Sequence, residues 1–441
     1  SREAESGAGV PPAISKEAAG TAAPHSAKYS DFRHIISQIG EHRGESYFIL
    51  KSIIINNLFG VDIMEEAVEI CKLRLFLKLV AQVEPDDSHP HYGLEPLPDI
   101  DFNIRAGNTL VGFASLEQVK QSMEGDMLKL LELPRIEEEA GIVDQAFQQF
   151  RRQQTEHGGK VTAEDKQNLR DKLAKLDDEL DCYLASEYGV ESGAGVPPAK
   201  SREAESGAGV PPAISKEAAG TAASLKAAGQ RPAPQKATPF EAWKASHQPF
   251  HWLVEFYGIM AQGGFDVVIG NPPYVEYSQL KRQYSLKGYK TEQSGNLYAF
   301  VLERNTHLAK QNARSGMIIP HSAICTDRMS TVQELFTGNP SATWISTYCI
   351  RPAKLFVGVD QRLCIYVWAH STTNSSLYGS RYHRWHEECR PFLLSQVQYA
   401  DISTIRFPNS MPKIHITQEV GLWQKVTRLK SISSAFSSRN G

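Results

Sequence analysis

The sequence lacks several features that would place it in common protein classes. Its six cysteines are scattered, and no two of them form a C-x-x-C pair. This pattern indicates reduced thiols in the cytoplasm and predicts neither a disulfide framework nor a metal site. No segment reaches the roughly 18 uninterrupted apolar residues that a membrane span requires, and the N-terminus lacks a signal-peptide pattern. We therefore expect a cytoplasmic protein without a membrane partner.

The sequence also carries almost no net charge. The formal charge is −3 and the isoelectric point is about 6.5, so there is no global positive field for nucleic acid. Any contact with DNA must come from local basic patches. The 441 residues, of which 41% are hydrophobic, suffice for one large domain with insertions or for two or three ordinary domains.

A low-complexity repeat interrupts the chain. Residues 1–23 recur letter for letter at 201–223, and ESGAGVPP appears again at 191–198. The repeat has almost no large apolar residues that could stack into a core, so it predicts disordered linkers rather than a solenoid. A docking segment is the alternative. We assign 1–24 and 191–238 to these linkers. The chain begins inside the repeat without an initiator Met, which indicates that an N-terminal part lies upstream.

The remaining sequence alternates predicted strands with predicted helices, as in an α/β fold with a mostly parallel sheet. Helical spacing is found at 64–83 and 295–311. The charged segment 116–190 has leucines at helical spacing, which predicts a helical insertion. Apolar runs typical of strands occur at 52–63, 102–113, 265–270, 314–320, 342–350 and 362–370.

Ligands of such sheets bind beyond the carboxyl ends of the strands. Asp62 ends the first run, and its carboxylate could accept two hydrogen bonds from the hydroxyls of a ribose. It could equally be an acid at the start of a helix. Gly107 and Asn108 end the second run, where Asn108 alone would be an ordinary turn residue.

The third run ends in Asn271-Pro272-Pro273-Tyr274. The prolines have no backbone donors and leave carbonyl oxygens free to accept hydrogen bonds. The Asn271 amide oxygen and the Pro272 carbonyl could hold the two N–H groups of a planar amine, and Tyr274 could stack on its ring. Holding both hydrogens out of the ring plane favours the geometry of attack by the amine. A rigid proline turn without chemistry is the alternative.

The motif and its surroundings resemble a known family. GFDVVIGNPPYV, the NLYAFVLER helix, the SGMIIP strand and the upstream NNLFGVDIMEEAVEICKLRLFL are similar to the S-adenosylmethionine-dependent adenine-N6 DNA methyltransferases of the large type IIG restriction–modification group. The resemblance covers about 29–115 and 240–410. It implies a Rossmann-like class I methyltransferase sheet, a role in restriction–modification or phage defence, and the S-adenosyl-L-methionine cofactor. Asp62 would bind the cofactor ribose, Ile63 would lie beside the adenine ring, and Gly107-Asn108, usually Gly-Asp, would make a weakened contact with the adenine amine.

The family also has a feature that this sequence lacks. Its Gly-rich loop, of the form D-P-x-x-G-S-G, follows the first, central strand, and no such segment occurs here. We therefore expect an incomplete sheet in which the strands ending at Asp62 and Gly270 are separated or in a non-family order, and doubtful activity of the chain alone. The cofactor half would be 25–115, the catalytic half 239–370, and the start of a target-recognition region 371–441. An upstream nuclease domain or a restriction partner would lie outside the chain.

Such an enzyme acts on a base flipped out of double-stranded DNA. The segment after the motif alternates basic residues with Tyr284 and Tyr289, which predicts a loop that contacts phosphates and stacks on bases. The basic residues are Lys281, Arg282, Lys287 and Lys290. A solvated amphipathic helix is the alternative. A protein or RNA methyltransferase with the same motif chemistry, and an inactive DNA-binding remnant, are the competing functions.

Overall fold

The computed structural model describes residues 44–85, 95–156, 162–190, 237–338, 341–370, 375–405 and 410–428, with a few positions between 33 and 42 and between 87 and 92. The repeat copies predicted to be disordered lie outside these residues. The chain divides into two units, which are Ser1–Phe59 with Cys71–Ile100, and Gly60–Ile70 with Asp101–Gly441.

The first unit contains α2 (Glu45–Asn57) and the C-terminal part of α3 (Glu65–Val80). The predicted strand at 52–63 is wrong over its first half, because α2 occupies that segment. The buried residues of α2 recur at the helical spacing of three and four, which a short β-branched run conceals in the sequence. These residues are Tyr47, Phe48, Lys51, Ile54 and Ile55.

The second unit holds a small parallel sheet of two three-residue strands. β1 (Gly60–Asp62) pairs with β2 (Ile104–Ala106), so that Asp62 lies beside Ala106. The predicted strand at 102–113 is therefore much shorter than expected. The Gly107 N–H donates to the Asp62 carbonyl over 2.9 Å, which joins the carboxyl ends of the two strands.

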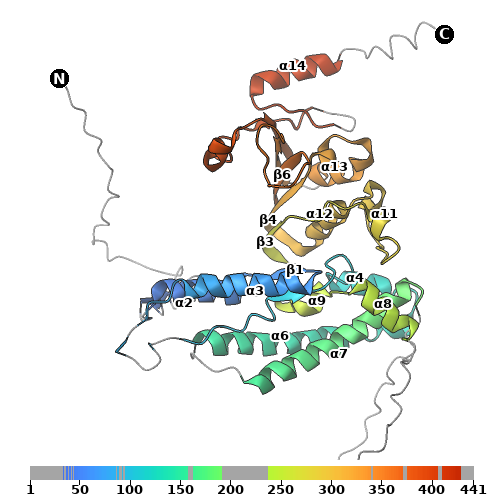
Figure 1. Cartoon of the computed structure of the whole chain (residues 1–441). Helices are drawn as coiled ribbons and strands as arrows, with labels where there is room; N and C mark the ends of the chain where they lie inside the picture. The colour runs from blue at the N-terminus through green and yellow to red at the C-terminus, as the bar shows by residue number, and fades with distance from the viewer. Residues whose placement is uncertain are drawn as a thin grey trace, which may run out of the picture. The chain divides into compact units, whose positions relative to one another are not determined.

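Helices follow β2, as the spacing of the leucines predicted. Figure 1 shows the two long helices of this region, α6 and α7, side by side. Leu169, Leu173, Leu176 and Leu180 of α7 are buried, and a reciprocal cap between Thr162 and Asp165 begins the helix. The helices of this region are α4 (Leu116–Ser122), α5 (Met127–Leu130), α6 (Leu133–Glu156) and α7 (Ala163–Glu187).

A second sheet carries the asparagine–proline motif. Its order is β3-β4-β6-β5-β7-β8 among the described residues. β3–β4 and β5–β7 are parallel pairs, whereas β6 runs antiparallel to both β4 and β5. The mostly parallel sheet expected from the sequence is therefore mixed. The strands are β3 (Phe265–Gly270), β4 (Ala309–Pro320), β5 (Ser341–Tyr348), β6 (Leu363–His370), β7 (Ser376–His383) and β8 (Ala400–Asp401).

The strands ending at Asp62 and at Gly270 lie in different sheets, as expected for separated strands. β3 is the edge strand of its sheet among the described residues. Its Val267 and Ile269 side chains are 59% and 79% exposed, which is unusual for apolar residues of a sheet. An exposed apolar edge is a surface that further chain could cover.

Shorter helices connect and cover these strands. Helices α12 and α13 pack against the second sheet, and their buried residues share its core. No helix among the described residues is long and apolar enough to cross a membrane. The remaining helices are α8 (Pro239–His247), α9 (Trp252–Glu255), α10 (Tyr257–Met260), α11 (Tyr277–Leu280), α12 (Leu297–Leu308), α13 (Ser330–Thr337) and α14 (Thr417–Arg428), with 3₁₀ turns η3 (Lys290–Ser294), η4 (His321–Ile324), η5 (Asp327–Met329) and η6 (Glu387–Phe392).

Candidate active site at the carboxyl ends of the strands

The asparagine–proline motif leaves the end of β3 with its asparagine exposed and its first proline buried. The Tyr274 hydroxyl lies 2.6 Å from the Asn271 amide oxygen and 3.0 Å from the Ile318 carbonyl of β4. A hydroxyl has one hydrogen, so Tyr274 donates to one of these acceptors at a time. The side chain of Asn271 is thus oriented by Tyr274, and its exposed amide faces solvent at the sheet edge.

The Tyr274 hydroxyl keeps its proton across the physiological range. Burial, with a smaller contribution from the Cys364 thiol, raises the pKa of Tyr274 to about 12. A protonated phenol can donate a hydrogen bond, whereas a phenolate can only accept one. The contact with Asn271 is therefore available at any pH at which the protein would act.

The chain after the motif is tied to the start of α12. The Leu297 N–H donates to the Val275 carbonyl over 3.0 Å, and the Tyr277 N–H to the Gly295 carbonyl over 2.8 Å. Gly295 has φ 67°, and a Cβ there would clash with the Arg328 guanidinium. The backbone of the turn therefore favours glycine, whereas the Arg328 side chain could move aside. These bonds hold the exit of the motif against a rigid helix.

Two buried charged residues of α12 support the site, and both were missed in the sequence. Glu303 is 4% exposed and accepts hydrogen bonds from the N–H groups of Lys290 and Thr291 at 3.0 and 2.9 Å. These N–H groups begin the turn η3, so the carboxylate caps it. The only signal in the sequence is an acidic and a basic residue next to each other in an apolar helix.

Arg304 is the second of these residues. Its Nη2 donates to the Leu110 and Gly112 carbonyls at 3.0 and 3.1 Å, and its Nε donates to the Tyr289 hydroxyl at 2.9 Å. Leu110 and Gly112 follow β2 of the first sheet, whereas α12 packs on the second. Arg304, 6% exposed, therefore links the two halves that the sequence predicted as cofactor half and catalytic half.

The predicted cofactor residues lie together at the ends of β1 and β2. The Asp62 carboxylate is exposed and accepts the Met64 N–H over 2.9 Å, as an acid at a helix start does. Ile63 beside it is 44% exposed. One hydrogen bond to Met64 leaves the carboxylate further acceptor capacity, so the helix-start role and ribose binding are compatible.

Gly107 and Asn108 form the other side of this group. A Cβ at Gly107 would lie 2.7 Å from the Phe250 ring, so packing alone requires glycine there. Asn108 is 3% exposed, and its amide oxygen accepts the Leu110 N–H over 3.1 Å. Its amide nitrogen has no hydrogen-bond partner among the described residues. A buried donor without an acceptor costs about 1–3 kcal/mol, so the site is suited to a ligand with a hydrogen-bond acceptor.

The structure thus forms two groups of predicted site residues. Asp62, Ile63 and Gly107-Asn108 meet at the first sheet, and Asn271 meets Tyr274 at the second. The two groups end strands of different sheets, so β-pairing does not bring them together. Arg304 is one of the described connections between their elements.

The three predicted DNA-binding residues differ in their surroundings. Lys281 lies 3.6 Å from the Glu292 carboxylate, and Lys287 donates to the Glu187 carbonyl over 2.7 Å. Arg282 is exposed and forms no hydrogen bond or ion pair with a described residue, so of the three it is the most available.

The predicted stacking role of the nearby tyrosines is wrong. Tyr284 is 8% exposed and belongs to the hydrophobic core. The Tyr289 hydroxyl donates to the Leu110 carbonyl over 2.7 Å and accepts from Arg304. Both rings face inward, because alternation in the sequence does not specify which side of an irregular segment faces the core.

A buried ionic network joins the helical insertion to the segment that precedes β3. The Phe113 N–H donates to His251 Nδ1 over 3.2 Å, so Nε2 carries the proton toward Asp181 at 3.0 Å. Burial, together with the charges of Glu255 and Asp181, raises the pKa of Asp177. These groups face one another in the interior, so we assign the network a structural role.

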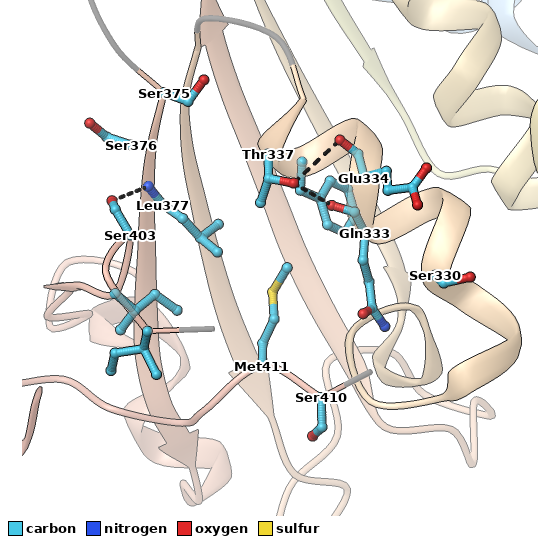
Figure 2. A pocket seen from close by; sticks show the side chains of 13 residues that line it. Ser330, Gln333, Glu334, Thr337, Ser375, Ser376, Leu377, Ser403, Ser410 and Met411 are labelled. Carbon is cyan, nitrogen blue, oxygen red and sulfur yellow. Dashed lines mark hydrogen bonds between the residues drawn. The ribbon is translucent and has the colours of Figure 1, made fainter. Parts of the chain in front are cut away.

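A separate cavity of about 540 Å³ lies between α13 and the start of β7. Figure 2 shows hydroxyl side chains around it, with Thr337 directed toward the Gln333 and Glu334 carbonyls of its own helix. Leu377 in the cavity wall lies near the start of β7, where it pairs with Thr343. The end of β7 that lies on the side of the motif is at His383. The cavity is therefore at the opposite end of the sheet from Asn271. Among the described residues no group of three or more His, Cys, Asp or Glu side chains is placed to hold a metal ion.

Comparisons with known proteins place the chain in a family. The family model described as Eco57I restriction-modification methylase matches residues 56–348, more than half of the chain and including both groups of site residues. A protein of Methanocaldococcus jannaschii named as a type II restriction enzyme and methyltransferase is 30% identical over 302 residues, which are 65% of this chain and 24% of that protein. The chain therefore spans about a quarter of this relative.

Solved structures also match parts of the chain. The match to the structure of the DrdV–DNA complex covers 36% of this chain and 20% of the DrdV chain, with 13% identity and a TM-score of 0.28. A second match is to a nuclease-deletion mutant of the type ISP restriction–modification enzyme LlaGI bound to a DNA substrate mimic. It covers 41% of this chain and 21% of the LlaGI chain, with 10% identity and a TM-score of 0.29. TM-scores this low do not establish a shared fold.

Proposed function

Because the chain belongs to the Eco57I restriction-modification methylase family, we propose that the full-length protein transfers a methyl group from S-adenosyl-L-methionine to the N6 amine of an adenine in double-stranded DNA. One observation carries the proposal. The Asn271 amide is exposed at the end of β3 and is oriented by the Tyr274 hydroxyl, which lies 2.6 Å away. An oriented amide oxygen next to a proline carbonyl is the arrangement that a planar amine requires.

Each residue then has a distinct role. The Asn271 amide oxygen and the Pro272 carbonyl accept the two N–H groups of the adenine amine, and Pro273 keeps the turn rigid. The Tyr274 ring stacks on the base while its hydroxyl positions Asn271. Holding the amine hydrogens out of the ring plane frees the nitrogen lone pair for attack, and this assistance is greatest in the transition state.

The cofactor site lies at β1 and β2 in this proposal. The exposed Asp62 carboxylate accepts from the ribose hydroxyls, Ile63 contacts the adenine ring, and the unpaired amide nitrogen of Asn108 donates to a ring acceptor. Gly107 shapes the turn. The cofactor would supply the methyl group by direct transfer, with no covalent bond to the protein. The sulfonium–methyl bond would break as the N–CH3 bond forms, which leaves a thioether, and the amine nitrogen would release one proton to solvent.

The target base must leave the duplex to reach Asn271. Arg282, with Lys281 and Lys287, contacts the DNA backbone near the motif. A restriction activity, from a further domain or a partner, would cleave DNA that lacks the methyl group. The family, and a relative whose name gives both a restriction enzyme and a methyltransferase, support this part of the proposal.

The substrate class is tested by offering labelled cofactor and three acceptors to the full-length protein: plasmid DNA, transfer RNA and a peptide-release factor. We expect label in the DNA alone. Label confined to transfer RNA or to the release factor would replace the proposal with the same chemistry on another substrate. DNA binding without label in any acceptor would indicate an inactive remnant.

A further inference from the structure

Three arginines line an open cavity that no part of the proposed reaction uses. Arg351, Arg362 and Arg384 surround a volume of about 870 Å³ together with Cys349, Ile350 and Pro352. All three arginine side chains are exposed. They come from three separate segments of the chain, 11 and 22 residues apart (362 − 351 and 384 − 362), so only the fold brings them together.

The strand register places this cavity at the same end of the sheet as Asn271. Leu363 at the start of β6 pairs with Pro320 at the end of β4 and with Tyr348 at the end of β5. Tyr348 in turn pairs with His383 at the end of β7. Arg362 directly precedes Leu363, and Arg384 directly follows His383. β3 ends immediately before Asn271. Because it runs parallel to β4, it also ends at this end of the sheet.

The three arginines have no neutralising carboxylate within the part of the chain that the structure describes. None of the three guanidinium groups forms a salt bridge with a carboxylate of the described residues. Asp360, whose pKa is lowered first by Lys354 and also by the charge of Arg351, is itself paired with Lys354. Unpaired guanidinium groups gathered around a cavity are suited to a phosphate, which they can contact through two parallel hydrogen bonds each.

The pKa values of two neighbouring groups are shifted, and the charges of Arg384 and Arg362 contribute to these shifts. A hydrogen bond from the Arg351 backbone, assisted by the charge of Arg384, lowers the pKa of the Cys349 thiol. Burial first, and then the charges of Lys413 and Arg362, lower the pKa of His321 to about 4. The arginine charges are the smaller causes of both shifts, and each favours the less positive form of the neighbouring group.

We propose that the cavity formed by Arg351, Arg362 and Arg384, hereafter the arginine pocket, binds a backbone phosphate of the DNA whose base is presented at Asn271. This inference rests on the proposed function. Neighbouring strands are about 4.8 Å apart, so β6 and β7 lie roughly 10 and 19 Å from β3 along the edge. At about 3.4 Å per nucleotide, the pocket reaches a phosphate about three to six nucleotides from the target base. The pocket positions the duplex and does not read its sequence.

The test is a salt titration of DNA binding by the full-length protein and by the triple variant R351Q/R362Q/R384Q, on a duplex of mixed sequence. The matched control is Arg314→Gln. Arg314 is exposed on the same sheet, but it pairs with Ala369 at the opposite end of β6. Thermal melting and cofactor titration of each variant check that folding and the cofactor site are intact.

We expect the slope of log K against log[salt] to fall by about 0.9 for each phosphate that the triple variant no longer binds, with affinity reduced roughly tenfold at about 0.1 M salt. R314Q should keep the wild-type slope. Equal slopes and affinities for the two variants would overturn the inference. A second result would also overturn it. In that case the three arginines are needed to bind inorganic phosphate at constant ionic strength, but the triple variant binds DNA as tightly as wild type.

The outcome is separable from that of the proposed function. If wild-type protein transfers no methyl group to DNA, the proposed function fails, whatever the salt slopes are. If wild-type protein methylates DNA and the triple variant binds DNA like R314Q, the arginine pocket alone is wrong. A triple variant that binds cofactor normally but methylates DNA with a raised KM and an unchanged kcat is the expected pattern, because the pocket contacts DNA equally before and during transfer.

Discussion

The hydroxyl of Tyr274 lies 2.6 Å from the amide oxygen of Asn271, three residues before it. The same hydroxyl reaches the Ile318 carbonyl of the neighbouring strand at 3.0 Å. The hydroxyl donates to one of these two acceptors at a time, but the Tyr274 ring packs against the core of the second sheet. When the hydroxyl bonds Asn271, the amide is therefore oriented by a fixed group before any substrate arrives. Preorganised polar groups of this kind need no rearrangement during reaction.

Tyr274→Phe tests this orientation, because it keeps the ring and removes only the hydroxyl. We expect the methyl-transfer rate to fall roughly tenfold, which corresponds to a hydrogen bond of about 1–1.5 kcal/mol. Cofactor affinity should not change, since Tyr274 lies on the second sheet. Single-turnover methylation beside calorimetric cofactor titration measures both. A rate equal to wild type would show that Asn271 needs no support from Tyr274.

Asp62→Ala tests the cofactor site. The cofactor dissociation constant should rise by a factor that corresponds to about 1–3 kcal/mol, the cost of leaving a hydroxyl pair without its acceptor. The rate at saturating cofactor should change less. Asp62→Asn is the matched control, because it keeps an acceptor for the Met64 N–H and loses the charge. If calorimetry gives the wild-type constant for both variants, Asp62 is only an acid at the start of α3.

Arg304→Met tests the connection between the two sheets. The variant keeps the apolar stem but leaves the Gly112 carbonyl without the Arg304 donor, while the Leu110 carbonyl keeps only the Tyr289 hydroxyl. We expect the free energy of unfolding to fall by about 2–5 kcal/mol, measured by urea denaturation of the full-length protein. Lys281→Met, which removes an exposed ion pair with Glu292, is the control and should cost less than about 1 kcal/mol. Equal reductions in both variants would contradict the role of Arg304.

His321 provides a prediction about pH. Its folded-state pKa of about 4 lies below the ordinary value of 6.5, chiefly because of burial. The unfolded state therefore binds the proton more readily, so the contribution of this group to stability is present above about pH 6.5 and is lost as pH falls toward about 4. Melting temperatures at about pH 7 and about pH 5 should differ less in His321→Asn than in wild type. An equal or larger difference in the variant would contradict the shift.

The parts of the fold that were predictable are those with strong local patterns. The apolar run 265–270 followed by two prolines predicted β3 and its turn, and the leucines of α7 predicted a helical face. The helix α2 was not predicted, because Ile53, Ile54 and Ile55 favour strands locally and only their tertiary contacts select the helix. The antiparallel direction of β6 depends on how the chain crosses the sheet, which no local pattern encodes.

The places of three candidate site residues in the fold were predictable for a related reason. Asp62, Asn108 and Asn271 follow apolar runs, so their place at strand ends could be inferred one residue at a time. Arg304 and the arginine pocket could not be inferred, because their significance depends on partners that are distant in the sequence. Arg304 meets Leu110 across 194 positions, and the three pocket arginines meet only through the register of β5, β6 and β7.

The central claim is that Asn271 holds the target amine of an adenine. It is tested most directly by nucleoside analysis of plasmid DNA after reaction with labelled S-adenosyl-L-methionine and the full-length protein, either wild type or Asn271→Ala. We predict N6-methyladenine with wild type and none above background with the variant, while both bind the cofactor with equal affinity. N6-methyladenine formed at the wild-type rate by Asn271→Ala, or label found on another base, would contradict the account.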